Sequence, residues 1–423
     1  MTSAPASPVR PPGHDAAQAS RPLPLRGNRD FRALLGSQAI SALGDAVSFT
    51  ALPLLVLALT GSGLAMGIVG ALQTLPDLVF GMVAGALADR SDRRRMMFLA
   101  DFGRAILTAL IPISVLLGGP TLAVVLVVAA PMSMLRALFL AGYTASVPAI
   151  VGRSQVGSAN AVFEAVYSFG YILGPAVAGL LASAIGPGLT LAVDAVSFLV
   201  SALGILLIGR SLRAPGDRPT TSIRADIREG IAYLAGHRVL RAAVAFWGLT
   251  SVTLAPLVAA LTYHVTRELG LDEAALGLVL TAFGVGTVTG ALLAARLRRR
   301  VVGLTLLLGN LGTGAAVMAS GLLPDLAPLL VAAFVGGVSQ TTILVTYITL
   351  RTVASPDALL GRIGSTARTI SLGLQPVGLV VGGLLIDTVG AGTALVLIGG
   401  VVIVIGLAFA PVADLRRASL TGR

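Results

Sequence analysis

Long apolar runs separated by short polar segments make up most of the chain. We expect twelve of these runs to form membrane-spanning helices, because about 20 apolar residues in a helix cross the hydrocarbon core of a bilayer. The predicted spans are residues 31–59, 64–87, 96–117, 121–149, 159–182, 190–208, 239–264, 273–295, 301–322, 325–350, 362–386 and 392–413.

A dense cluster of charges interrupts this pattern between the second and third runs. Apart from Leu87, the segment 85–95 consists of small and charged residues, and it predicts a short loop between two membrane helices. A degenerate copy occupies residues 290–300, about half the chain length further on. An internal repeat of this size is typical of a duplicated transporter bundle. The residues of the first loop that we single out are Gly85, Asp89, Arg90, Arg93 and Arg94.

The arginines define the expected orientation in the membrane. If the N-terminus lies inside, the inner loops hold nearly all of the loop arginines, and the outer loops hold a single cation, Arg267. Because arginine concentrates in cytoplasmic loops, both termini are expected on the cytoplasmic side of a cell membrane. The expected divisions are a cytoplasmic tail (1–28), a six-helix bundle (29–208), a cytoplasmic linker (209–238), a second six-helix bundle (239–413) and a tail (414–423).

Composition supports an all-α membrane protein and excludes several functions. The chain is 55% hydrophobic and 12% charged, with a mean hydropathy of +0.91. Its net charge of +11 does not indicate nucleic-acid binding, because the arginines lie at the ends of apolar runs. The absence of Lys and Cys removes a lysine-containing phosphate loop and thiol chemistry, and the three His residues have no metal-ligand spacing. We therefore expect no cofactor, no metal and no enzyme activity.

Ionisable residues inside spans are the candidates for function, because they are costly there. Asp45 lies in the middle of the first span, on a polar stripe with Gln38. Desolvation suits such a carboxyl group to carry a proton, although a structural role is the alternative. Arg136, in the fourth span, must pair, and Asp45 or Asp77 is the expected partner. The pair would be either a coupling switch or a static ion pair.

The remaining charges in spans divide into two groups. Asp77, in the second span, is a further candidate for proton coupling. Glu164, in the fifth span, is another, because it shares a helix face with two tyrosines. Asp101 and Arg104 are expected to brace the arginine-rich loop. We expect structural roles for the carboxylates that the predicted spans place near outer ends, Asp194 and Asp387.

The second half of the chain has a single deep charge, Arg368. This contrast leads to the hypothesis that the first half handles protons and that the second half mainly contacts substrate. The expected cavity residues of both halves are Gln38, Tyr167, Tyr171, Trp247, Gln340, Tyr347, Arg368 and Gln375.

Small residues recur along the fifth span at Gly170, Gly174 and Gly179, with Pro175 among them. Small faces allow helices to pack closely, and proline kinks a span. Packing explains this pattern in either case, and the kink is also a candidate hinge.

Taken together, these motifs resemble the major facilitator superfamily, and in particular its twelve-helix drug–proton antiporter branch, which includes macrolide-efflux and enterobactin-export proteins. Segment 85–95 is similar to the loop signature between helices 2 and 3, Arg136 falls at the helix-4 arginine motif, and segment 170–179 is similar to the helix-5 motif of antiporters. The resemblance implies two pseudo-symmetric bundles, proton-driven export and alternating access. It also implies that Asp89 bonds the start of helix 11 and stabilises an outward-facing state, although Asp92 replaces a glycine of the signature.

The expected function is therefore export of small lipophilic compounds, such as a drug, an antibiotic or a siderophore, in exchange for protons. A proton-coupled importer or a flippase for lipid-like molecules of the same fold is the first alternative, and a membrane receptor or scaffold is the second. The expected partners are a small-molecule substrate, protons and the lipid bilayer, and we expect a monomer.

Overall fold

The computed structural model describes residues 24–213, 223–297, 302–356 and 359–412, and these residues are almost entirely helical. Within these ranges twelve helices are long and apolar enough to cross a membrane, which agrees with the predicted number of spans. The chain is thus a multi-pass membrane protein. The predicted tails, apart from residues 24–28, and residues 214–222 of the linker lie outside the described residues.

Six spans form the first bundle. Asn28 caps the first helix, because its side chain accepts a hydrogen bond from the Phe31 amide. Asp92 caps the third in the same way, accepting from the amides of Arg94 and Arg95. The helices are α1 (Arg29–Thr60), α2 (Gly63–Ala88), α3 (Arg93–Leu116), α4 (Thr121–Val151), α5 (Val156–Ile185) and α6 (Pro187–Ile205).

The second bundle differs in having two interrupted spans. Its seventh span breaks before Leu257, and its eleventh breaks at Leu374; a proline stands at each break, Pro256 and Pro376. Proline lacks a backbone donor and cannot continue the helical ladder. The elements are α7 (Ile223–Gly236), α8 (Arg238–Leu254), α9 (Leu257–Tyr263), the π-helical turn η4 (His264–Glu268), α10 (Glu273–Leu297), α11 (Val302–Ser320), α12 (Leu326–Val353), α13 (Leu360–Gly373), α14 (Gln375–Val389) and α15 (Ala391–Phe409).

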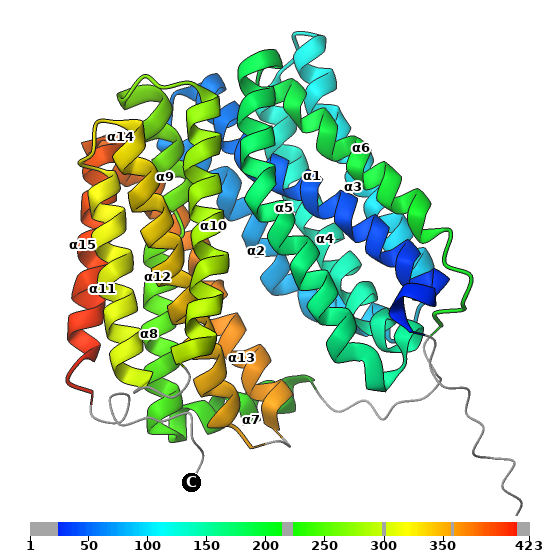
Figure 1. The fold of residues 1–423 in the computed structure, drawn as a ribbon. Coiled ribbons are helices and arrows are strands. Elements are labelled where there is room, and N and C mark those ends of the chain that lie inside the picture. The colour runs from blue at the N-terminus through cyan, green and yellow to red at the C-terminus, as the bar shows by residue number, and fades with distance from the viewer. Residues whose placement is uncertain (1–23, 214–222, 298–301, 357–358, 413–423) are drawn as a thin grey trace, which may run out of the picture.

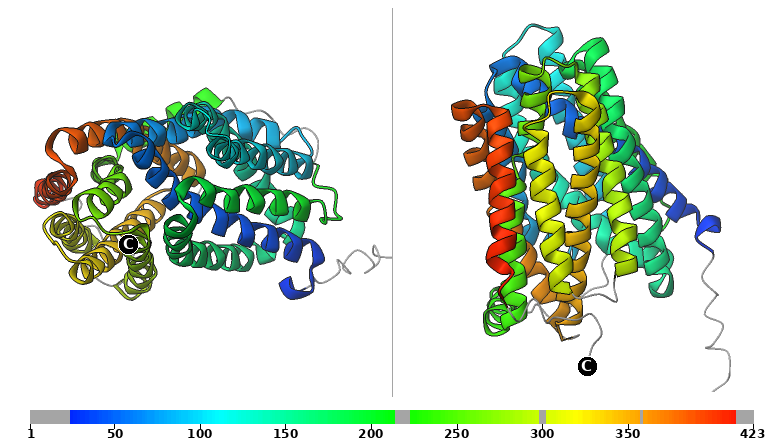
Figure 2. Two further views of the ribbon diagram at one scale, coloured as in Figure 1. Left: turned by 90° about the horizontal axis from the view of Figure 1, so that it is seen from above. Right: turned by 60° about the vertical axis from the view of Figure 1, so that its left-hand side comes forward.

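The two bundles stand side by side and meet along two helix pairs, α2 with α14 and α5 with α10 (Figures 1 and 2). We call the end that carries loop 85–95 the inner end and the opposite end the outer end. The ribbons converge at the outer end and diverge toward the inner end, where α7 and α13 lie (Figure 1). This arrangement is an inward-facing one if the arginine-rich end lies in the cytoplasm.

Close backbone contacts and one carboxylate join the bundles at the outer end. Asp387, on α14, accepts hydrogen bonds from the Ser62 hydroxyl at 2.6 Å and from the Leu64 amide at 3.0 Å. It also accepts one from the Gly63 amide. The carboxylate therefore caps the N-terminus of α2 across the bundle boundary, where a negative charge is favourable. We call these contacts, together with the close approach of Gly179 on α5 to Glu273 on α10 at the same end, the outer seal.

Replacing Asp387 by asparagine is expected to weaken the outer seal. A carboxylate at a helix N-terminus contributes about 1 kcal/mol, so the outward-open population should rise about fivefold. The measurement is labelling of a cysteine placed at Leu379, near the α2–α14 contact, by an impermeant maleimide from outside; the chain has no other cysteine. Asp325→Asn, in an outer loop, is the matched control. Equal labelling rates for both variants would contradict this role.

Candidate functional site

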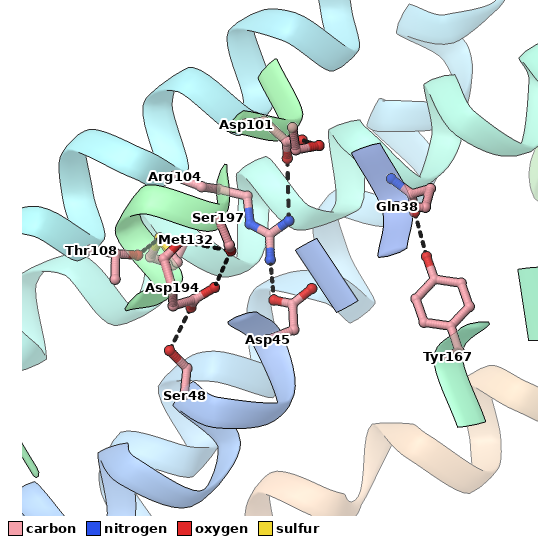
Figure 3. A network of polar contacts seen from close by, with 11 residues as sticks. Gln38, Asp45, Ser48, Asp101, Arg104, Thr108, Met132, Tyr167, Asp194 and Ser197 are labelled. Carbon is pink, nitrogen blue, oxygen red and sulfur yellow. Dashed lines mark hydrogen bonds and ion pairs between the residues drawn. The ribbon is translucent and has the colours of Figure 1, made fainter. Parts of the chain in front are cut away.

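Arg104 on α3 is the centre of a buried cluster of charges in the first bundle (Figure 3). Its side chain is 4% exposed, and its Nη2 lies 2.6 Å from Oδ1 of Asp45 on α1. Its Nη1 lies 3.4 Å from Oδ1 of Asp101, one turn away on the same helix. The guanidinium also stacks 3.8 Å above the Phe198 ring centroid. Arg104 thus bridges two carboxylates inside the membrane-spanning region.

A third carboxylate belongs to the same cluster. Asp194 on α6 is 1% exposed and accepts hydrogen bonds from the hydroxyl groups of Ser197, at 3.1 Å, and Ser48. Asp101 is fully buried and accepts a further hydrogen bond from Ser201 at 2.6 Å. Three carboxylates therefore surround one guanidinium. We call Asp45, Asp101, Arg104 and Asp194 the charge cluster.

Close packing of α1 against α6 makes the cluster possible. A Cβ on Gly44 would lie 2.0 Å from Oγ of Ser197 and 2.6 Å from Oδ1 of Asp194. No side chain fits at this position, so glycine allows α6 to place its polar groups directly beside Asp45.

Several sequence-based expectations change here. Among the described contacts, the ionic partner of Asp45 is Arg104, and the pairing expected for Arg136 stays a prediction. Asp101 pairs with Arg104 and does not brace loop 85–95. The reason is depth: α3 begins at Arg93, which places both residues in the buried middle of the bundle. Asp194 likewise lies two turns inside α6 rather than at its outer end. The side chain of Asp77 lies outside the described residues.

A second polar group borders the cluster on the side of α5. The Asp45 carboxylate is 45% exposed, and Tyr171 is 57% exposed and within electrostatic range of Asp45, Arg136 and Glu164. The side chains of Arg136 and Glu164 are themselves exposed. The backbone oxygen of Tyr171 contacts α10 of the second bundle near Gly284. Tyr171 therefore lies at the bundle boundary, and Asp45, Arg136 and Glu164 lie within electrostatic range of it.

Two predicted cavity residues of the first bundle form a direct contact. The Tyr167 hydroxyl on α5 donates to Oε1 of Gln38 on α1 at 2.5 Å, and Gln38 is buried. This pair ties α1 to α5 about two turns inward of Asp45. The hydrogen bond between Gln38 and Tyr167 positions α1 and α5 around the charge cluster, and the Gln38 side chain is not exposed to a cavity in this conformation.

The predicted residues of the second bundle are more dispersed. Trp247 on α8 is half-buried and stacks on Tyr347 of α12, with ring centroids 5.6 Å apart. Tyr347 is only 2% exposed and packs in the core of this bundle, so in this conformation it supports Trp247 instead of lining an open surface. Arg368 on α13 is exposed. Gln340 and Gln375 are half-buried.

The loop between α2 and α3 is held mainly within the first bundle. Arg93 is buried and donates from Nε to the Ala88 carbonyl at 3.1 Å and from Nη1 to the Ala145 carbonyl at 3.0 Å. Arg94 donates to the Leu206 carbonyl. Among the described contacts, the exposed Asp89 carboxylate has one ionic partner, Arg93 at 3.9 Å. Its expected bond to helix 11 belongs to an outward-facing state and stays a prediction.

The small residues of α5 face two different helices. A Cβ added at Gly174 would lie 2.3 Å from Cβ of Ala46 on α1, and one added at Gly170 would lie 3.1 Å from the carbonyl oxygen of Ala42. Gly179 instead faces the second bundle, where its Cβ would lie 2.5 Å from the carbonyl oxygen of Glu273 on α10. Pro175 is buried, and α5 continues through it without a break. The motif therefore packs α1 and also forms part of the outer seal.

Replacing Gly179 by valine is expected to force α5 and α10 apart at the outer end. A side chain that meets backbone within 3 Å costs about 1–3 kcal/mol in a packed contact, which is enough to favour outward opening by about fivefold or more. The measurement is the distance between spin labels on Ser183 and Asp272, in exposed positions on either side of the seal. An unchanged distance distribution would exclude Gly179 from the seal. Gly157→Val, where a Cβ meets open space, is the control.

Twelve spans in two bundles, with interrupted helices in one and buried charges in the other, define a membrane transporter of the major facilitator superfamily. The chain matches the family described as transmembrane secretion effector over residues 19–420, and it belongs to that family.

Characterised relatives cover most of the chain. It is 31% identical over 371 residues to the multidrug efflux pump Tap of Mycolicibacterium fortuitum, which covers 84% of this chain and 89% of the relative. It is 26% identical over 353 residues to the enterobactin exporter EntS of Escherichia coli O1:K1 / APEC, covering 82% and 83%.

Solved structures agree in fold. A bacterial homologue of the human lysosomal transporter Spinster, in an inward-facing and unoccupied conformation, superposes with a TM-score of 0.71 at 15% identity, covering 92% of this chain and 98% of the other. The nucleoside transporter NupG gives a TM-score of 0.73 at 13% identity, covering 89% and 98%.

Proposed function

We propose that this protein exports small lipophilic compounds from the bacterial cytoplasm or inner leaflet in exchange for protons, by alternating access between the two bundles. The names of the relatives, a multidrug efflux pump and an enterobactin exporter, support export. The arginine-rich inner loops support an orientation with both termini in the cytoplasm.

The observation that carries proton coupling is the ion pair between Asp45 and Arg104. One member is half-exposed and can exchange a proton, whereas the other is buried and stays charged. Protonation of Asp45 removes an attraction between α1 and α3, and Asp101 keeps the guanidinium compensated. The energy available is sufficient for a cycle, since one charge crossing 100 mV contributes about 2.3 kcal/mol.

The substrate class follows from the groups at the bundle boundary. Aromatic side chains such as Tyr171 and Trp247 favour lipophilic compounds. The carboxylates of Asp45 and Glu164 favour neutral or cationic ones, and exposed arginines on α4 and α13 partly offset this preference. We therefore assign neutral or weakly cationic lipophilic compounds to the boundary between the bundles.

A two-stage experiment tests the proposal. Cells expressing the protein are screened for accumulation of a compound panel with and without an uncoupler, and hits are followed in everted vesicles with an imposed pH gradient. The proposal expects lower accumulation that the uncoupler restores, and uptake into everted vesicles that are acidic inside. Flux in the opposite direction would indicate an importer. Unchanged accumulation of every hydrophobic compound and siderophore would point away from export.

A further inference from the structure

Asp194 differs from the other two carboxylates of the charge cluster. Those two contact the guanidinium directly, whereas the described contacts of Asp194 are with the hydroxyl groups of Ser48 and Ser197. A carboxylate that is 1% exposed and hydrogen-bonded to neutral groups is the most expensive of the three to keep ionised. A serine hydroxyl can donate to a carboxylate or accept from a carboxylic acid, so the Ser48 contact persists in both protonation states.

The charges that face Asp194 come from two helices. α1 contributes Asp45, and α3 contributes Arg104, which also pairs with Asp101, so the cluster holds three potential negative charges against one positive charge. Carboxylates this close to one another in a buried cluster disfavour each other's ionisation, because like charges repel strongly where water is excluded. Binding one proton halves the excess negative charge and leaves both ion pairs of Arg104 intact.

A small cavity adjoins Asp194 inside the first bundle. Ser48, Gln73 and Thr108 supply polar groups to its lining. Val125, one turn from the outer start of α4, and Leu191, between Asp194 and the outer start of α6, also line it. The cavity therefore extends from Asp194 toward the outer end. All residues that line it belong to the first bundle, whereas substrate would pass between the bundles.

We propose that Asp194 is a second proton-binding group of the transporter, loaded from the outer side through this cavity. The proposal rests on the proton antiport proposed above and assigns it a separate entry route within one bundle. In each loading step a proton from the outer solution adds to a carboxylate oxygen of Asp194, and no other bond changes.

The test is infrared spectroscopy of the purified full-length protein in lipid, without substrate, as a function of pH. Among the carboxyl C=O bands of the wild type that change with pH, one should be absent in Asp194→Asn and a different one should be absent in Asp45→Asn. Asp101→Asn should retain both of these bands. An Asp194→Asn spectrum identical to that of the wild type would overturn the proposal. Asp194→Glu, which keeps an acid at the site, should shift the band and serves if the asparagine variant fails to fold.

The entry route has its own readout. Leu191→Phe fills the cavity and should slow the deuterium-induced shift of the Asp194 band severalfold, with the Asp45 band unaffected. Equal slowing of both bands, or of neither, would contradict entry through this cavity. If the wild type shows the Asp194 band but moves no protons with substrate, the proposed proton antiport is wrong, and the assignment of Asp194 as a proton-binding group is retained. If it couples protons without that band, the Asp194 assignment alone fails.

Discussion

Arg104→Met is expected to remove most of the folded protein. The substitution leaves Asp101 fully buried without its cation and leaves Asp45 without its ion-pair partner. Removing one partner of a buried ion pair costs about 3–5 kcal/mol, a large share of the stability of a typical domain. Size-exclusion profiles and thermal unfolding in detergent would record the loss.

Two further variants test whether the loss of stability comes from the buried ion pair or from any substitution of an arginine in α3. Arg95→Met removes an exposed arginine from the same helix and should unfold like the wild type. Arg104→Met combined with Asp101→Asn should recover much of the lost stability, because position 101 then no longer holds a fully buried charge that has lost its cation. If the double variant is as unstable as the single one, the buried pair is not the cause.

Asp45→Asn is expected to abolish proton-coupled transport while the protein stays folded. Asparagine has nearly the same volume as aspartate, and the site is half-exposed, so the packing of α1 changes little. The variant loses the titratable carboxyl group. Uptake driven by a pH gradient should fall by at least about tenfold, to the level of protein-free vesicles, whereas exchange of labelled for unlabelled substrate should continue.

The matched control is Asp325→Asn, which removes a carboxylate that makes no capping hydrogen bond in an outer loop. It should retain full pH-driven uptake. Loss of both uptake and exchange in Asp45→Asn would instead indicate a role in binding or folding. Retention of both would remove Asp45 from the coupling mechanism.

Much of the fold could be predicted because membrane spans are long and strongly apolar. The predicted twelve spans agree with the structure in number, and Asn28 and Gly63 lie close to the predicted boundaries. The break in the seventh span was not predicted, although a proline within an apolar run, here Pro256, can indicate an interrupted helix. Pro175 shows why such a signal is ambiguous, because α5 runs through it without interruption.

The partner of Asp45 could not be predicted in the same way. Spacing along one helix identifies a polar stripe, but α1 and α3 meet only because both pack on α6, a relation that the sequence of one helix does not contain. Arg104 and Asp101 carried a usable signal, since two opposite charges three residues apart within an apolar run favour a buried pair. Gly44 also stands next to Asp45 in the sequence, but its close contact with Ser197 depends on the packing of α6, a helix far along the chain.

Proton movement driven by substrate alone tests the central claim most directly. Sealed vesicles would contain the protein and a pH-sensitive dye, with a gradient of a transported compound, no initial pH gradient and a clamped membrane potential. Our account predicts proton flux opposite to the compound, absent in Asp45→Asn. Movement of the compound without any accompanying change in internal pH would contradict it.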